Sequence, residues 1–208
     1  MDTLLWNRVS ADAPLLILAH GAGAPMDSEF MASLAGQLSA RGVSVVRFEF
    51  PYMQQRRESG GKRPPNRAPQ LLESFREVLH GVDARHVYIG GKSMGGRMAS
   101  LLACEEAVAG VIAFGYPFVP PGKDRSPRIA HFAEMKAPLL ICQGERDPFG
   151  GRDQVGAMGL AIRNVSLAWI ADGDHDFKPR KRSGHEWAEN MASAADAAAT
   201  FIFSRKGK

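Results

Sequence analysis

Residues 87–97 read Val-Tyr-Ile-Gly-Gly-Lys-Ser-Met-Gly-Gly-Arg, and this stretch decides how the whole chain is interpreted. The apolar run at 87–89 predicts a strand, which leads into the pentapeptide Gly91-Lys92-Ser93-Met94-Gly95. A helix is expected from about residue 96 to residue 104. A strand, a sharp turn and a helix in that order expose a nucleophilic serine at the edge of a sheet. We therefore predict that Ser93 is a nucleophile, although the pentapeptide alone would be a weak signal.

The glycines of this pentapeptide are expected for steric reasons. A sharp turn strains the backbone at Ser93 and brings neighbouring chain close, which leaves no room for a Cβ atom at Gly91 or Gly95. Gly96 is expected to serve the same close packing. The alternative interpretation is a glycine-rich turn that contains an incidental serine.

Short apolar runs alternate with helical segments along the chain, as is typical of βα units in a mostly parallel sheet. Strands are predicted at 15–19, 43–48, 87–89, 110–114, 139–143 and 165–170, and helices at 28–41, 69–79, 96–104 and 184–203. Residues 51–67 are predicted to be a long surface loop and residues 116–122 an irregular segment. No repeat or linker divides this series. We predict a single α/β domain over 1–208, with helices on both faces of the sheet.

Composition points to a compact globular protein. With 208 residues, 45% of them hydrophobic and 23% charged, the chain has enough apolar material for one sizeable core. The first residues lack a basic segment followed by an apolar stretch, and no apolar run approaches the roughly 18 residues of a membrane helix. We therefore predict a cytoplasmic location. Cys104 and Cys142 are predicted to be small core residues rather than a disulfide or a thiol nucleophile.

The chain is basic, with a formal net charge of +4 and a pI near 9.3. The excess lies at 56–57, 62–63, 178–182 and the tail 205–208, and this scatter favours solvated loops over a binding patch. We therefore predict neither a nucleic-acid partner nor a membrane partner. Lys92, Arg146 and Lys178 are close in sequence to candidate site residues. They suggest that the substrate is anionic, and the alternative with at least equal weight is that these residues are solvated or form structural ion pairs.

A serine needs a general base within hydrogen-bond reach and an acid that orients the base. The segment Asp172-Gly173-Asp174-His175-Asp176-Phe177 follows the last predicted strand, so His175 is expected at the same sheet edge as Ser93. His20 comes too early for the chain order Ser, acid, His that this type of fold uses. The remaining histidines lie at helix ends, in helices or before a strand: His80, His86, His131 and His185. His175 is the predicted base.

The predicted acid is Asp147, in the segment Gln143-Gly144-Glu145-Arg146-Asp147-Pro148-Phe149-Gly150. This segment follows the penultimate strand, at the carboxyl edge where such sheets place their sites. Glu145 is the alternative in the same segment. Three aspartates also neighbour His175 in sequence, but they are too local to orient it and suit loop caps and turns better: Asp172, Asp174 and Asp176.

The developing oxyanion of a tetrahedral intermediate needs two hydrogen-bond donors. One is expected from the residue after the nucleophile, which is Met94. The other is expected from the loop after the first central strand, His20-Gly21-Ala22, where the amide of Ala22 is favoured over that of Gly23.

Five segments together resemble the dienelactone-hydrolase-like α/β-hydrolases, and especially the branch similar to testis-expressed protein 30. They are 20–24, 50–52, 90–97, 143–150 and 172–177. The resemblance implies an α/β-hydrolase fold without a lid and a triad of Ser93, Asp147 and His175, but it implies no substrate. That branch also includes a subunit of a histone-acetyltransferase complex. A non-catalytic interaction scaffold is therefore the alternative function.

The predicted activity is hydrolysis of a carboxylic ester or thioester of a small molecule, through an acyl-enzyme on Ser93. This chemistry requires no metal and no organic cofactor. Without a lid, small or water-soluble esters are favoured over long-chain lipids. The loops at 51–67 and 116–127 are expected to cover part of the cleft.

Overall fold

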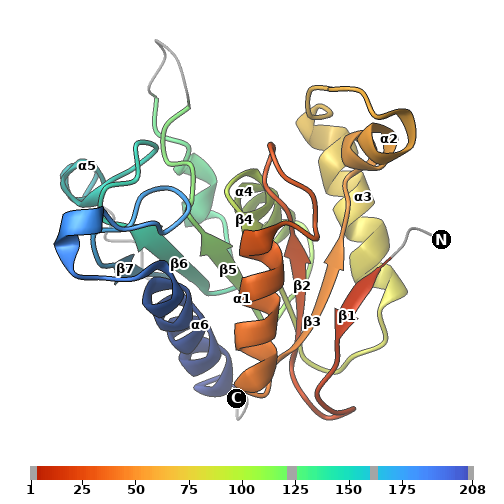
Figure 1. The fold of residues 1–208 in the computed structure, drawn as a ribbon. Helices are drawn as coiled ribbons and strands as arrows, with labels where there is room; N and C mark the ends of the chain where they lie inside the picture. The colour runs from red at the N-terminus through yellow and green to blue at the C-terminus, as the bar shows by residue number, and fades with distance from the viewer. Residues whose placement is uncertain (1–3, 121–125, 160–163, 206–208) are drawn as a thin grey trace.

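A seven-stranded sheet forms the centre of the computed structural model, which describes residues 4–120, 126–159 and 164–205. Its strand order is β1-β3-β2-β4-β5-β6-β7, and every neighbouring pair is parallel except β1 with β3 (Figure 1). The strands are Leu5–Asn7 (β1), Leu15–Ala19 (β2), Ser44–Phe48 (β3), Val87–Lys92 (β4), Gly110–Phe114 (β5), Leu139–Gly144 (β6) and Val165–Ile170 (β7).

Both faces of the sheet are buried because successive side chains of a strand point to opposite faces. In β2, Leu15 and Ile17 join one apolar cluster, whereas Leu16 and Leu18 join the other. This explains why the central strands are continuous apolar runs rather than alternating ones. The predicted α/β class, with a mostly parallel sheet, is confirmed.

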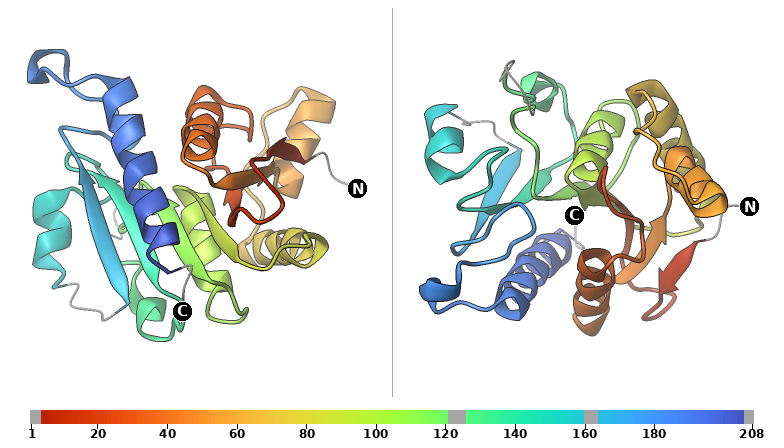
Figure 2. Two further views of the ribbon diagram at one scale, coloured as in Figure 1. Left: turned by 90° about the horizontal axis from the view of Figure 1, so that it is seen from below. Right: turned by 45° about the horizontal axis from the view of Figure 1, so that its top comes forward.

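Two pairs of helices cover the sheet. The helices α3 (Ala68–Gly81) and α4 (Met94–Leu102) pack on one face, and α1 (Glu29–Ala40) and α6 (Trp187–Phe203) pack side by side on the other (Figure 2). The small alanines on the buried side of α6 allow it to pack closely, and Ala194, Ala195 and Ala198 are fully buried. Within the described ranges no inserted lid domain is present. None of the helices described here has the length and apolar character needed to cross a bilayer.

The prediction of a loop over 51–67 is wrong for its first half. Helix α2 (Pro51–Ser59) occupies it, with Pro51 in the first turn and Gly60 ending the helix at φ 66°. Only Tyr52 and Met53 of this helix are buried, so its sequence lacks the apolar periodicity that indicates a helix. The remaining residues, 60–67, have no regular structure.

Several short elements were also not predicted: β1, α5 (Arg152–Ala157) and the single turns η1 (Ala130–Ala133) and η2 (Lys181–Ser183). Strand β4 runs on to Lys92, and α4 starts at Met94, so the turn that carries Ser93 is a single residue long. The irregular segment is confirmed over 116–120, and residues 121–125 of that loop lie outside the described ranges. Residues 206–208 of the basic tail lie outside them as well.

Candidate active site

Ser93 occupies the sharp turn between β4 and α4, at the carboxyl edge of the sheet. Its backbone has φ 50° and ψ −112°, a conformation that side chains with a Cβ atom rarely adopt. The strain is held in place on both sides. The Ser93 N–H donates to the carbonyl oxygen of Phe114 in β5 (2.9 Å), and the Ser93 carbonyl accepts the N–H of Arg97 (3.0 Å).

The predicted crowding at the glycines of the turn is confirmed. A Cβ atom on Gly91 would lie 2.6 Å from the Ala19 carbonyl oxygen, and one on Gly95 would lie 2.6 Å from the same oxygen. A Cβ atom on Gly96 would lie 2.7 Å from the carbonyl oxygen of Gly91. These neighbours are backbone atoms, which cannot move aside as the end of a side chain can.

We expect Gly95→Ala to lower the free energy of unfolding by about 1–3 kcal/mol, the usual cost of overpacking. The matched control is Gly36→Ala, in the exposed middle of α1, where a Cβ atom would meet nothing within 4 Å. That change should instead raise the free energy of unfolding, by about 1 kcal/mol, because alanine favours the helix. Urea unfolding of both variants measures this. Equal effects in the same direction would contradict the packing argument.

The structure brings Ser93, His175 and Asp147 together from three different loops. The Nε2 atom of His175 is 2.9 Å from the Ser93 Oγ, and its Nδ1 atom is 2.7 Å from the Asp147 Oδ2. An ionised carboxylate only accepts hydrogen bonds, so this pairing favours the imidazole tautomer with its proton on Nδ1. The Nε2 atom can then accept the Ser93 hydroxyl proton. The Asp147 side chain is fully buried, and His175 stays 21% exposed.

Gln143, which sequence reasoning did not select, holds the Asp147 carboxylate in place. Its Nε2 donates to the Asp147 Oδ2 (2.9 Å), while the N–H of Phe149 donates to the Oδ1 (2.8 Å). The same amide accepts the Tyr116 N–H on its Oε1 atom (2.7 Å). Gln143 is fully buried at the end of β6. The only signal in the sequence is an uncharged polar residue closing an otherwise apolar run.

The other candidate acids have different partners. Glu145 pairs with Arg152 (2.8 Å), and Asp172 pairs with Arg146 and Arg180. The Arg180 guanidinium holds the pKa of Asp172 well below its usual range. Asp174 caps its own loop by accepting the N–H groups of residues 176 and 178 on its Oδ1, as predicted for turn formers.

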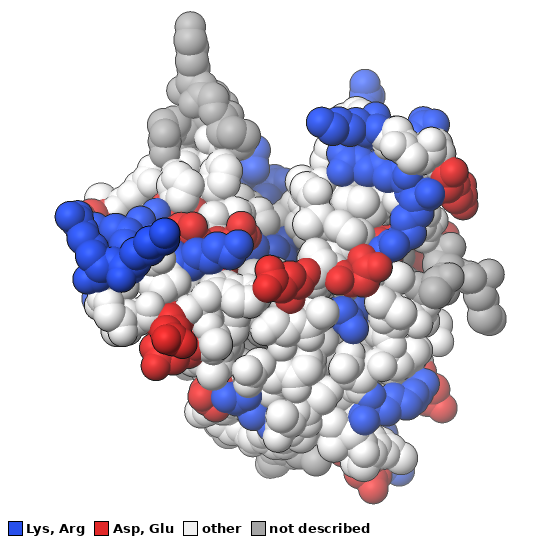
Figure 3. All heavy atoms as spheres, in the orientation of Figure 1, with Lys and Arg blue, Asp and Glu red and all other residues white. Residues whose placement is uncertain are grey.

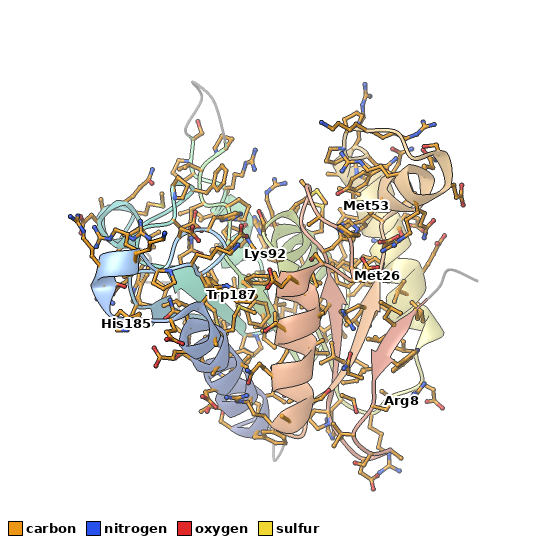
Figure 4. The ribbon with its side chains drawn as sticks, in the orientation of Figure 1. Arg8, Met26, Met53, Lys92, His185 and Trp187 are labelled. Carbon is orange, nitrogen blue, oxygen red and sulfur yellow. The ribbon has the colours of Figure 1, made fainter. Side chains whose placement is uncertain are left out.

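Lys92 supports the loop that carries His175. Its Nζ donates to the His175 carbonyl oxygen (2.8 Å) and lies 3.2 Å from the Asp176 Oδ1. Figure 4 shows Lys92 near the first turn of α1, where its Nζ is 5.3 Å from the centre of the Phe30 ring. Burial lowers the pKa of the Lys92 ammonium, and the Asp176 carboxylate opposes this shift. Lys92 therefore has a structural role.

The sequence suggested an anionic substrate on the basis of Lys92, Arg146 and Lys178, and the last two also contact other groups of the protein. Arg146 pairs with Asp172 and donates to the Asp172 carbonyl oxygen (2.9 Å). Lys178 is exposed, with its Nζ 5.8 Å from the centre of the Trp187 ring. The predicted anionic preference thus cannot rest on Lys92 or Arg146.

The loop after β2 brings Gly21 and Ala22 beside Ser93. A Cβ atom on Gly21 would lie 3.7 Å from the Ser93 Cβ. The Tyr52 hydroxyl, from α2, lies 3.0 Å from the Ala22 carbonyl oxygen and 3.3 Å from that of Gly21. Helix α2 therefore fixes the orientation of the peptide groups in this loop.

His20 supports the same loop from within the core. Its Nε2 accepts the N–H of Phe50 (3.1 Å), so its Nδ1 carries the proton and donates to the Gly21 carbonyl oxygen (2.7 Å). Burial lowers the pKa of His20, which keeps the ring neutral. The sequence excluded His20 as the base, and the structure places it as a support for the loop.

Both cysteines are unpaired, and burial raises the pKa of the fully buried Cys142 thiol to about 12, so it stays protonated. Among the residues that the structure describes, no group of three or more His, Cys, Asp or Glu side chains is arranged to hold a metal ion.

A mostly parallel sheet of this strand order, with a strained serine on the turn after its central strand, defines the α/β-hydrolase class of fold. A family model described as alpha/beta hydrolase domain matches residues 12–203, and the chain belongs to that family.

Solved structures share this fold. Est1E from Butyrivibrio proteoclasticus superposes with a TM-score of 0.73 at 15% identity, covering 99% of this chain and 94% of that one. An α/β serine hydrolase homologue from Coxiella burnetii gives a TM-score of 0.71 at 20% identity, with 96% and 90% covered. A lid-less α/β serine hydrolase from Xanthomonas campestris gives 0.66 at 16% identity, with 96% and 88% covered. A structure named as a dienelactone hydrolase, from Klebsiella pneumoniae, gives a TM-score of 0.69 at 19% identity, with 98% and 100% covered.

Proposed function

We propose that this protein is a serine hydrolase that cleaves a carboxylic ester or thioester of a small molecule. The observation that carries the proposal is the hydrogen-bonded chain from the Ser93 Oγ through His175 to the buried Asp147. Hydrogen bonds alone do not make a catalytic group. Here, however, the serine also sits in a strained turn, and strain of this kind clusters at active sites.

The reaction would proceed in two halves. In the first, the Nε2 of His175 takes the Ser93 proton while the Oγ attacks the carbonyl carbon, and the bond to the leaving alcohol or thiol breaks as His175 returns the proton to it. In the second half, His175 takes a proton from water, and the resulting hydroxide attacks the acyl-enzyme. The carboxylic acid leaves, and Ser93 regains its proton.

Two backbone amides would stabilise the oxyanion of each tetrahedral intermediate. The Met94 N–H lies in the first turn of α4, where helix amides have no acceptor within the helix and the helix dipole favours negative charge. The Ala22 N–H is in the loop beside Ser93 that Tyr52 and His20 hold. Preorganised donors of this kind contribute several kcal/mol to many hydrolases, on the order of 3 kcal/mol each.

Two finer assignments belong to the same proposal. The five segments quoted above support a place in the branch similar to testis-expressed protein 30, which a phylogeny of family sequences would test. The two unpaired cysteines support a cytoplasmic location, because reducing compartments keep thiols free. Imaging of the tagged full-length protein would test that location.

Covalent labelling tests the nucleophile directly. We expect a fluorophosphonate probe to label the folded protein and Ser93→Ala to abolish the labelling, because only an activated serine attacks such phosphorus centres. Ser193→Ala, which removes an exposed serine from α6, is the matched control and should be labelled like the unaltered protein. Unlabelled folded protein would favour the interaction scaffold instead. Labelling that persists in Ser93→Ala would place the nucleophile elsewhere.

A further inference from the structure

A hollow beside α4 contains an arginine that this mechanism does not use. Arg97 lies one helical turn after Ser93, and its N–H donates to the Ser93 carbonyl oxygen. Side chains of a helix tilt toward its N-terminus, so the Arg97 side chain leans toward the turn that carries Ser93. The hollow has a volume of about 580 Å³, and other residues that line it include Pro120, Arg128, His131 and Glu134.

The loop after β5 connects this hollow with Ser93 and His175. The loop begins at Gly115, where a Cβ atom would lie 3.4 Å from the His175 Nδ1. Five residues later, Pro120 lines the hollow. One wall of the hollow thus starts in contact with the candidate base, and the opposite element, α4, starts at the candidate nucleophile. Both elements thus run from the candidate site to the hollow, although neither Ser93 nor His175 lines it.

The Arg97 guanidinium lacks the partners that other arginines of this protein have. Its Nε atom is buried and makes no hydrogen bond. In the described ranges, six other arginines form ion pairs with carboxylates, namely Arg41, Arg57, Arg76, Arg146, Arg152 and Arg180. No carboxylate described here lies within 4 Å of Arg97, although Glu134 lines the same hollow. A half-buried guanidinium that has no carboxylate partner is free to bind an anionic ligand that enters the hollow.

The surroundings of Arg97 are neutral or basic on most sides. Burial lowers the pKa of His131, and the positive charge of Arg97 lowers it further, to about 4. The ring is therefore uncharged at neutral pH. Arg128 adds a second positive charge to the lining, and Glu134 is its negative member. Figure 3 shows Lys and Arg side chains on both sides of the hollowed upper face of the molecule, with Asp and Glu side chains among and below them. Two arginines against one glutamate give the lining of the hollow a positive balance, which favours the approach of anions.

We propose that Arg97 binds an anionic oxygen group of the substrate, such as a carboxylate, so that the enzyme prefers esters that carry negative charge. The inference rests on the proposed function and specifies its substrate class. A guanidinium presents two parallel N–H donors, which match the two oxygens of a carboxylate, and such charge-assisted bonds are stronger than neutral ones.

Two p-nitrophenyl esters with the same succinyl chain test this preference: the half-ester of succinic acid, which is anionic, and its methyl ester, which is neutral. Arg97→Gln should lower kcat/KM for the half-ester by about tenfold to hundredfold, and change that for the diester by less than about twofold. Arg85→Gln is the control, because Arg85 is exposed before β4, at the end of that strand away from Ser93. Equal losses on both esters, or none, would overturn the proposal.

A binding measurement separates this proposal from the nucleophile assignment. Monomethyl succinate should bind to Ser93→Ala protein in a calorimetric titration, and adding Arg97→Gln should weaken that binding by about the same tenfold to hundredfold. Unchanged binding overturns the Arg97 site even if Ser93 proves to be catalytic. Weakened binding supports the Arg97 site even if Ser93 proves not to be catalytic. If Arg97→Gln fails to fold, Arg97→Lys serves in both arms: a loss confined to the anionic ligand supports the site, and no selective loss overturns it.

Discussion

Alanine at Ser93 or at His175 is expected to lower kcat for ester hydrolysis by on the order of 10⁵- to 10⁶-fold, and replacing both is expected to lower it no further. The reason is that nucleophile and base act as one unit: without the Nε2 acceptor 2.9 Å away, the Ser93 hydroxyl keeps its proton and attacks poorly. Steady-state kinetics on an activated ester, with the single and double variants at equal concentration, measures this non-additivity.

Two matched controls accompany that experiment. His86→Ala removes an exposed histidine just before β4, at the end of the strand away from Ser93, and Ser193→Ala removes an exposed serine from α6. Both should retain the kcat of the unaltered protein. If the loss of kcat in the double variant were about the product of the losses in the two single variants, Ser93 and His175 would not act as one unit. The same conclusion would follow if His175→Ala kept kcat within about tenfold of the unaltered protein.

Asp147→Asn should lower kcat by about 10⁴-fold. An asparagine amide cannot reproduce the acceptors that this position needs. Placed where Oδ2 lies, the NH₂ group would face the donating Gln143 and favour the His175 tautomer without a free Nε2 acceptor. Placed where Oδ1 lies, it would face the N–H of Phe149. Either orientation sets a donor against a donor in a buried site, so the variant should also be less stable.

Asp174→Asn is the control for that change. Asparagine can still accept the two loop N–H groups that the Asp174 Oδ1 accepts, so kcat should stay close to that of the unaltered protein. The comparison isolates the residue that orients His175. If Asp147→Asn kept its turnover and Asp174→Asn lost it, the assignment of the orienting role to Asp147 would be wrong.

The sheet could be predicted from sequence because its strands carry their own signal. Buried parallel strands are continuous apolar runs, and residues 15–19 and 110–114 form such strands with the predicted limits. The half-buried edge strand at 165–170 also has its predicted limits. Ser93 could be found for a related reason, because a strand leads straight into its turn. The spatial meeting of Ser93, His175 and Asp147 follows from parallel topology, which gathers the carboxyl ends of strands at one edge.

Features that depend on distant partners could not be predicted. Helix α2 is mostly polar and exposed, and contacts with other segments stabilise it, such as Arg57 with Asp27 and Glu49. Strand β1 is three residues long and has one antiparallel partner. Gln143 gains its role from Tyr116, 27 residues before it, and a single amide in an apolar run gives no hint of that. Local patterns do not encode such contacts.

Lys92 has a further consequence for the motion of the site. Its buried ammonium donates a hydrogen bond to the His175 carbonyl oxygen, and the Asp176 carboxylate balances its charge. Both partners belong to the loop that carries the imidazole. If that loop swung outward, the ammonium would lose both partners while still surrounded by apolar groups such as Phe30. Opening of this loop would therefore break contacts with the end of β4, and this cost favours the position in which the imidazole is aligned with the serine.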